Sequence, residues 1–232
     1  ISDCLVGSEM CIRDRSLADS KFDSVNIYDC TSQWGVFSIA GPDSRSFLKK
    51  IVVCEDPDKT LSNKEFPWLS YRDIEIGMCP VRALRVAYTG ELGWELHHPI
   101  EMQNYLLDIL LSSGKEFNLK LVGARAQNWL RLEKSYKAFG SDLGRDAGPF
   151  ESNLSRFVDI NKNFLGKDAL LKRKIDVSCV TLLIDGPKDI DPWGREALYN
   201  ETEEVMLGRL TSAGYSVPVS YTHLRAHETI AD

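Results

Sequence analysis

The two ends of the chain can be encoded by complementary DNA, and this limits the residues that can be expected to form a native fold. Residues 5–14 read LVGSEMCIRD, and residues 219–228 read VSYTHLRAHE. The codons CTC GTG GGC TCG GAG ATG TGT ATA AGA GAC encode the first segment. Their reverse complement translates into the second segment, codon for codon. Ten consecutive complementary codons are not expected by chance.

The encoded DNA resembles a transposon-type sequencing adapter that was read inward from both ends of a gene fragment. We therefore interpret residues 1–15 and 218–232 as adapter-derived tails and do not expect them to belong to the native fold. His223 and His227 are not proposed as ligands, and Cys4 and Cys11 are not proposed as a redox pair. The full chain carries a net charge of −6, and the interior carries about −4 once the tails are removed.

Composition excludes several classes of function. The 232 residues are 43% hydrophobic and 27% charged, as in a soluble globular protein. The acidic balance argues against nucleic-acid and anionic-membrane partners, and no apolar run reaches the roughly 18 residues of a membrane span. The six cysteines are scattered, with no CxxC pair and no Cys/His cluster. We therefore expect no metal site and a reducing, cytoplasmic compartment.

Hydrophobic periodicity predicts mixed helices and strands, with a change of pattern near residue 175. Before that residue helices and strands alternate, and after it strands dominate. We therefore predict a domain over 16–174 and the start of a second domain over 175–217. The predicted helices are 42–51, 99–113, 124–136 and 164–174, and the predicted strands are 25–31 paired with 34–40, then 71–78, 81–88, 177–184, 197–199 and 205–215.

The stretch YTGELGWEL at 88–96 combines two glycines, two aromatic rings and two carboxylates between a strand and a helix. Gly90 and Gly93 suit a tight turn, after which Trp94 and Leu96 should share one face of a strand. Glu95 and His97 should lie on the other face. A carboxylate beside aromatic rings can accept paired hydrogen bonds from an aminopyrimidine edge. The alternative is a strand–turn–strand with solvated glutamates. Residue spacing alone slightly favours this alternative over a binding site.

Other polar groups receive plainer interpretations. Arg131 and Glu133 fit an ordinary surface charge pattern on a helix, and His97 with His98 fits a strand end at the surface. The glycines form neither a P-loop nor a GxGxxG run, and no Ser/His/Asp set is evident.

Five ordered segments carry a family resemblance: SIAGPDSRSFLKKI, RVAYTGELGWELHHP, NWLRLEKSYKAFGSDL, PFESNLSRFVDINKNFLGKDALL and IDPWGREALYN…GRLTSAGYS. They resemble the folate-binding, T-protein-like region of dimethylglycine and sarcosine dehydrogenases, which is similar to the aminomethyltransferase of the glycine cleavage system. The resemblance covers residues 25–217. It implies an α+β fold, with a T-protein-like folate-binding domain of mixed or antiparallel sheets and helices, followed by a truncated C-terminal β-barrel.

The resemblance also implies a reaction. An FAD domain upstream would oxidise an N-methylated glycine or similar amine to an iminium. The folate-binding region would then pass the one-carbon unit to tetrahydrofolate, so FAD is implied only for the missing domain. The alternatives are a stand-alone aminomethyltransferase, a folate-dependent demethylase and a non-enzymatic folate-binding relative. We expect the parent protein to be an enzyme and this chain alone to be inactive.

Site residues follow from the same resemblance. Glu91 and Glu95 are the candidates for holding the pterin edge, with Glu95 preferred if it faces the pocket. Tyr88 and Phe139 are candidates for lining or stacking on the ring, and the family often has Trp or Tyr at the Phe139 position. Gln127 stands where the free T-protein has an arginine, so Arg125 is a poor candidate ligand. The family's catalytic aspartate lies upstream, so we assign no catalytic residue here.

Overall fold

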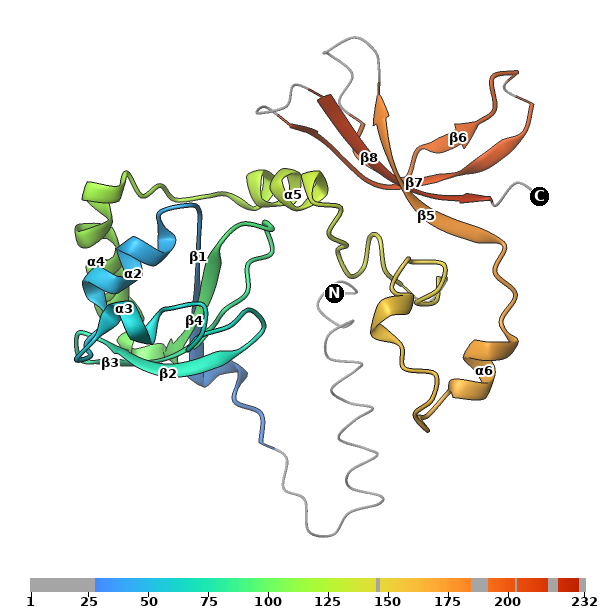
Figure 1. Ribbon diagram of the computed structural model, residues 1–232. Helices are drawn as coiled ribbons and strands as arrows, with labels where there is room; N and C mark the ends of the chain where they lie inside the picture. The colour runs from blue at the N-terminus through green and yellow to red at the C-terminus, as the bar shows by residue number, and fades with distance from the viewer. Residues whose placement is uncertain (1–27, 145–146, 185–191, 203, 217–220, 230–232) are drawn as a thin grey trace. The chain divides into compact units, whose positions relative to one another are not determined.

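Two units, divided between Val122 and Gly123, make up the computed structural model of the protein (Figure 1). The structure describes residues 28–144, 147–184, 192–202, 204–216 and 221–229. Residues 1–15, which we predict to be an adapter-derived tail, lie outside this described part. The domain boundary predicted near residue 175 falls inside the second unit.

A four-stranded antiparallel sheet forms the first unit, with strand order β1-β4-β3-β2. One face of this sheet carries the core, where buried Phe47 and Leu48 of one helix and Leu106 of another pack against Trp94 and Leu96. The strands are β1 (Trp34–Ala40), β2 (Tyr71–Ile76), β3 (Cys79–Leu84) and β4 (Gly93–Pro99), the helices are α2 (Ser44–Ile51), α3 (Pro57–Thr60) and α4 (Gln103–Gly114), and short 3-10 helices cover Thr31–Gln33, Ile100–Met102 and Lys115–Phe117.

The hairpin predicted between 25–31 and 34–40 is wrong. Thr31–Gln33 is a 3-10 helix, residues 25–27 lie outside the described part, and β1 pairs with β4 instead. In that pairing Phe37 lies opposite Leu96, and Ile39 lies opposite Trp94. Ile39, Trp94 and Leu96 belong to the buried core of the first unit, and Phe37 packs against it, so this pairing contributes to the core. Tertiary burial therefore overrides the local alternation.

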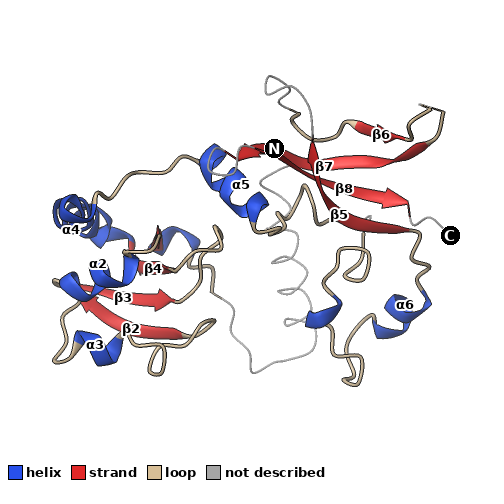
Figure 2. Cartoon of the chain, turned by 45° about the horizontal axis from the view of Figure 1, so that its top comes forward, coloured by secondary structure: helices blue, strands red, loops and turns tan. Residues whose placement is uncertain are grey.

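The second unit combines two helices with a second antiparallel sheet of strand order β5-β8-β7-β6 (Figure 2). Helix α5 packs closely on β7, since a Cβ added to Gly214 would lie 2.4 Å from the Trp129 ring. The elements are α5 (Ala124–Glu133), a 3-10 helix (Ser155–Phe157), α6 (Lys167–Lys172), β5 (Val177–Ile184), β6 (Ala197–Tyr199), β7 (Met206–Ser216) and β8 (Tyr221–Thr229).

The predicted fold class is confirmed in its main lines. Helices and antiparallel sheets share the chain, and β5 and β6 have the bounds that periodicity predicts. The described strands of the second unit form a four-stranded sheet, and the closed C-terminal barrel stays a prediction. None of the helices in the described part of the chain is long and apolar enough to span a membrane. Within the described residues, Cys30, Cys54 and Cys79 form no disulfide bond.

Strand β8 falls in the segment that we predict to be an adapter-derived tail. Its backbone pairs with β5 from Val177 to Ile184 and with β7 from Gly208 to Ser216. Every residue of the strand offers a backbone N–H and a backbone C=O, so the segment can satisfy the open hydrogen-bonding edges of both strands. This compatibility explains the pairing whatever the origin of the residues. The adapter origin stays a prediction.

Deleting residues 218–232 tests that origin. Residues that were never selected to pack should add little, so we expect the melting temperature to shift by less than about 3 °C, the change that roughly 1 kcal/mol produces in a chain of this size. Differential scanning calorimetry of the full and shortened chains makes the comparison. A loss of many degrees would show that β8 belongs to the native sheet, and the adapter interpretation would have to be abandoned.

Candidate functional site

The turn between β3 and β4 is fixed to the start of helix α2. Gly90 has φ +71° and donates to the Ala87 carbonyl at 3.2 Å, which closes the turn. The Leu92 carbonyl then accepts two hydrogen bonds, one from the Gly41 N–H at 2.9 Å and one from the Ser44 hydroxyl at 2.9 Å. Both ends of the turn are therefore held, and the side chains that it carries start from a defined backbone.

Gly93 is required by close backbone approach rather than by its torsion angles. A Cβ at this position would lie 2.4 Å from the Ile39 carbonyl oxygen and 2.9 Å from the Ala87 side chain. Strand β1 can therefore pair with β4 at this point only because residue 93 lacks a side chain. The sequence predicts a turn glycine at this position, whereas the structure shows a strand glycine in contact with β1.

The two faces of β4 follow the predicted alternation. Trp94 and Leu96 are fully buried, and the Trp94 ring meets Phe66 edge-on at 6.2 Å between centroids. On the opposite face the Glu95 carboxylate lies 3.2 Å from Nε2 of His97, and both side chains are about one-third exposed. The sequence therefore assigned these four side chains to the correct faces.

The predicted site residues of the first unit come from this turn and strand. Tyr88 and Glu91 lie in the turn and are exposed, whereas Glu95 follows on β4 and is half-buried. Within the described residues Glu91 has no hydrogen bond or ion pair, whereas the Glu95 carboxylate is near His97. The fourth candidate, Phe139, belongs to the second unit.

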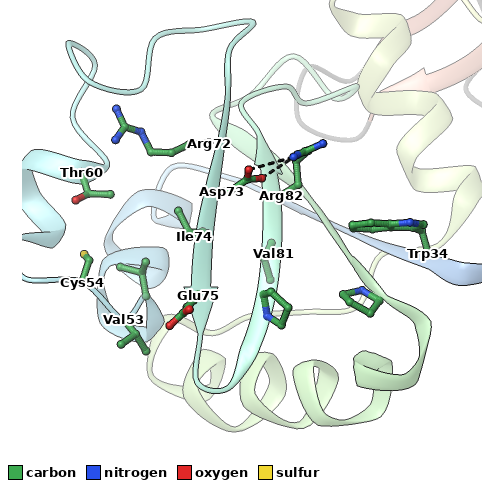
Figure 3. A pocket seen from close by; sticks show the side chains of 13 residues that line it. Trp34, Val53, Cys54, Thr60, Arg72, Asp73, Ile74, Glu75, Val81 and Arg82 are labelled. Atoms are coloured by element: carbon green, nitrogen blue, oxygen red, sulfur yellow. Dashed lines mark hydrogen bonds and ion pairs between the residues drawn. The ribbon is translucent and has the colours of Figure 1, made fainter.

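A pocket of about 490 Å³ lies elsewhere in the first unit, and Tyr88, Glu91 and Glu95 are not among its lining residues. Figure 3 shows Asp73 of β2 and Arg82 of β3 facing each other at this pocket. Arg82 donates to both carboxylate oxygens of Asp73, at 2.8 and 3.1 Å, and this interaction lowers the pKa of Asp73. Because the two charges neutralise each other, we assign this pocket no chemistry.

Phe139 is presented by a loop that is closed by its own hydrogen bonds. The Ala138 carbonyl accepts from the N–H groups of Asp142 at 2.9 Å and Leu143 at 3.1 Å. Gly140, with φ +92°, donates to the Leu143 carbonyl at 2.8 Å. The Phe139 side chain remains 60% exposed. The loop therefore holds an aromatic ring in solvent, as a stacking residue requires.

The surface interpretation of Arg131 is wrong, because this side chain is 1% exposed and forms a buried ion pair with Asp142. Asp142 also accepts hydrogen bonds from the Thr211 hydroxyl at 2.5 Å, the Ser212 hydroxyl at 2.7 Å and the Ala138 N–H at 2.9 Å. Burial raises the pKa of Asp142, but these hydrogen bonds and the Arg131 charge outweigh it and leave the pKa lowered. Arg131 also donates to Asn128 Oδ1, the Tyr136 carbonyl and Ser212 Oγ.

The predicted surface position of His98 is also wrong, because this side chain is fully buried. Its Nδ1 donates to the Leu96 carbonyl at 2.9 Å, and its ring stacks on Phe37 with 4.9 Å between centroids. The burial of His98 could have been predicted from the sequence, because Trp94, Leu96 and His98 share one strand face. Within the described residues no three His, Cys, Asp or Glu side chains are grouped to hold a metal ion.

Comparison with known proteins identifies the family. The model of the GCVT N-terminal domain matches residues 6–162, which is more than half of the chain. The chain belongs to the GCVT N-terminal domain family. This membership shows the resemblance inferred from the five ordered motifs to be correct.

Relatives of this GCVT-domain chain include two kinds of longer protein. Human mitochondrial dimethylglycine dehydrogenase is 38% identical over 204 residues, 84% of this chain and 22% of that protein. Mouse mitochondrial sarcosine dehydrogenase is 29% identical over 218 residues, 90% of this chain and 23% of that protein. The chain thus spans less than a quarter of the length of either relative.

The fold is shared with a shorter relative. The crystal structure of glycine cleavage system aminomethyltransferase T from Bartonella henselae matches with a TM-score of 0.69 and 20% identity. The match covers 84% of this GCVT-domain chain and 52% of that protein. It supports the mixed helix and antiparallel-sheet architecture described above.

Replacing Gly93 by alanine tests the close approach of β1 and β4. We expect the free energy of unfolding to fall by about 3 kcal/mol, because the new methyl group would force two strand backbones apart. Chemical denaturation measures the change. Gly144→Ala is the control, since a Cβ there meets nothing within 4 Å. Equal stability of the two variants would contradict the packing at Gly93.

Asp142→Asn tests the buried ion pair. The variant leaves the Arg131 charge buried without its anion, so we expect a loss of about 3 kcal/mol. The folded-state pKa lies below the ordinary 3.8, so this stabilisation should be complete at neutral pH and disappear as the pH falls through the folded-state value. Urea denaturation from pH 7 to pH 3 measures both effects.

Asp73→Asn is the matched control, because its ion pair with Arg82 is equally well formed but exposed. Little change in melting temperature is expected there. An Asp142→Asn variant as stable as the wild type at pH 7 would show that the buried pair does not organise the second unit.

Proposed function

We propose that this chain is the tetrahydrofolate-binding, one-carbon-transfer region of an FAD-dependent dimethylglycine or sarcosine dehydrogenase-like protein. It would pass the one-carbon unit of an oxidised N-methyl amine to tetrahydrofolate. The main observation behind this proposal is that an anchored turn and the strand after it present Tyr88, Glu91 and Glu95 within a GCVT-family fold. The 38% identity to human dimethylglycine dehydrogenase over 84% of the chain supports the dehydrogenase branch.

The geometry suits a flat heterocycle with hydrogen-bond donors along one edge. A carboxylate accepts two parallel N–H bonds from an aminopyrimidine, and such charge-assisted bonds are stronger than neutral ones. Glu95 offers a half-buried carboxylate on a rigid strand, and Glu91 offers a carboxylate without a partner among the described residues. Tyr88 supplies an exposed ring next to these carboxylates that could line or stack on the heterocycle, and Phe139 remains a separate candidate for ring stacking.

In this proposal the residues of the chain bind and orient rather than exchange protons. The carboxylates hold the pterin edge, the aromatic rings hold its faces, and the acceptor nitrogen is thereby positioned toward the incoming one-carbon unit. FAD would supply the oxidation of the amine from another domain of the parent protein. The reducing, cytoplasmic compartment expected from the cysteines remains part of the proposal.

A stand-alone aminomethyltransferase is the main alternative. An aminomethyltransferase from Caldanaerobacter subterraneus is 34% identical over 151 residues, 65% of this chain and 39% of that protein. The dehydrogenase match covers 84% of this chain against 65% for the aminomethyltransferase, which favours the dehydrogenase branch. The gene sequence around this region would decide, because a GxGxxG strand–helix fingerprint upstream of Ser16 would indicate the flavin branch.

Glu95→Gln and Glu91→Gln test the proposed grip. Glutamine keeps the shape but removes the charge and replaces one acceptor oxygen by a donor, so the variant at the gripping residue should bind tetrahydrofolate about tenfold more weakly. Isothermal titration calorimetry of the full chain measures the dissociation constant. The residue with the larger loss is the one that holds the pterin edge.

Glu75→Gln serves as the control, because Glu75 is an exposed glutamate that lines the 490 Å³ pocket on the same sheet. Its affinity should equal that of the wild type. A well-folded chain that shows no tetrahydrofolate binding would refute the proposed function. A loss at Glu75 alone would move the site to the pocket.

A further inference from the structure

Trp193 is the most exposed of the five tryptophans, with 81% of its surface accessible. It lies in the turn before β6, within one of the five segments that carry the family resemblance, and it is not among the candidate site residues. A large apolar ring left in water loses the free energy that burial would provide. An indole in this position therefore calls for an explanation beyond folding.

The turn that carries Trp193 has a constrained backbone. Arg195 adopts φ +80°, which is unusual for a residue with a side chain, and Gly194 adopts φ +99°. The Trp193 N–H donates to Glu196 Oε1 at 2.9 Å, and the Arg195 N–H donates to the Leu210 carbonyl at 2.7 Å. Strained residues that persist in a well-bonded turn are concentrated at functional sites.

The indole itself is held from one side by Arg125. The Arg125 guanidinium carbon lies 5.5 Å from the Trp193 ring centroid and 5.3 Å from the Trp129 ring centroid. Trp129 in turn packs against Gly214 of β7. These cation–π contacts restrict the rotamer of Trp193, so a ligand that stacks on the ring would lose less side-chain entropy on binding.

Trp193 and Phe139 are anchored at the same point of β7. Asp142, whose backbone closes the Phe139 loop, accepts hydrogen bonds from the hydroxyls of Thr211 and Ser212. A Cβ added to Gly194, next to Trp193, would lie 3.1 Å from the Thr211 carbonyl oxygen. The register between β7 and β8 shifts at this position, between Leu210 and Ser212. The two segments that carry these exposed aromatic residues thus contact the same β-bulge of β7.

We propose that Trp193 is a second aromatic contact for the flat ring system of tetrahydrofolate, acting together with Phe139. The inference rests on the proposed function and extends it by one residue. Indole faces stack on conjugated rings of many kinds, which suits the pterin and the aminobenzoyl ring alike. Trp193 is a binding residue in this assignment and takes no part in proton transfer.

Calorimetric titration of the full chain with tetrahydrofolate tests the assignment. Trp193→Ala should weaken binding about tenfold, the size of one ring-stacking contact, and Trp193→Phe should restore most of the affinity. Trp68→Ala is the matched control, since Trp68 is 64% exposed and lies in the first unit. Its affinity should equal that of the wild type.

Fluorescence provides a second readout that does not depend on a destabilising variant. Tetrahydrofolate should quench the tryptophan emission of the wild type and of Trp68→Phe, whereas Trp193→Phe should lose much of that quenching. Equal quenching in Trp193→Phe, together with unchanged affinity in Trp193→Ala, would overturn the inference and leave the proposed function intact. A folded wild-type chain that does not bind tetrahydrofolate would overturn both.

Discussion

The buried ion pair between Arg131 and Asp142 ties together three parts of the second unit that are distant in sequence. Arg131 belongs to α5, Asp142 to the Phe139 loop, and their shared partner Ser212 to β7. Removing two charges from water is costly, and the hydroxyls of Thr211 and Ser212 with the Ala138 N–H offset that cost. The shape of the loop, the seating of the helix and the position of the bulge therefore depend on one polar cluster.

Residue periodicity predicted the elements whose burial is decided locally. The faces of β4, the bounds of β5 and the helices of both units follow from spacing that repeats over a few residues. The partner of β1 could not be read in this way, because pairing with β4 depends on Ile39 and Trp94 meeting across more than fifty residues of chain. Sequence neighbours suggest a hairpin, whereas the shared core selects a distant strand.

The candidate site residues also differ in whether local sequence or distant contacts determine their position. Glu91 and Glu95 could be proposed from a short stretch, because turn, strand and carboxylates are contiguous there. Arg131 could not be placed, since its helix pattern looks like a solvated face until Asp142 and Ser212 are brought to it. Trp193 stands in one of the five segments that carry the family resemblance, but its spacing indicated no role for the ring. Its contact with Arg125 joins residues that only the folded second unit brings together.

The shape of the loop around Phe139, which we propose as a binding element, does not depend on the residue at position 139. Asp142, Gly140 and backbone hydrogen bonds define the loop, and the Phe139 side chain contributes little to that framework. Position 139 can therefore exchange one aromatic ring for another without rebuilding its support. In the proposed binding role, such a loop could change its ligand preference by single substitutions while other residues maintain its stability.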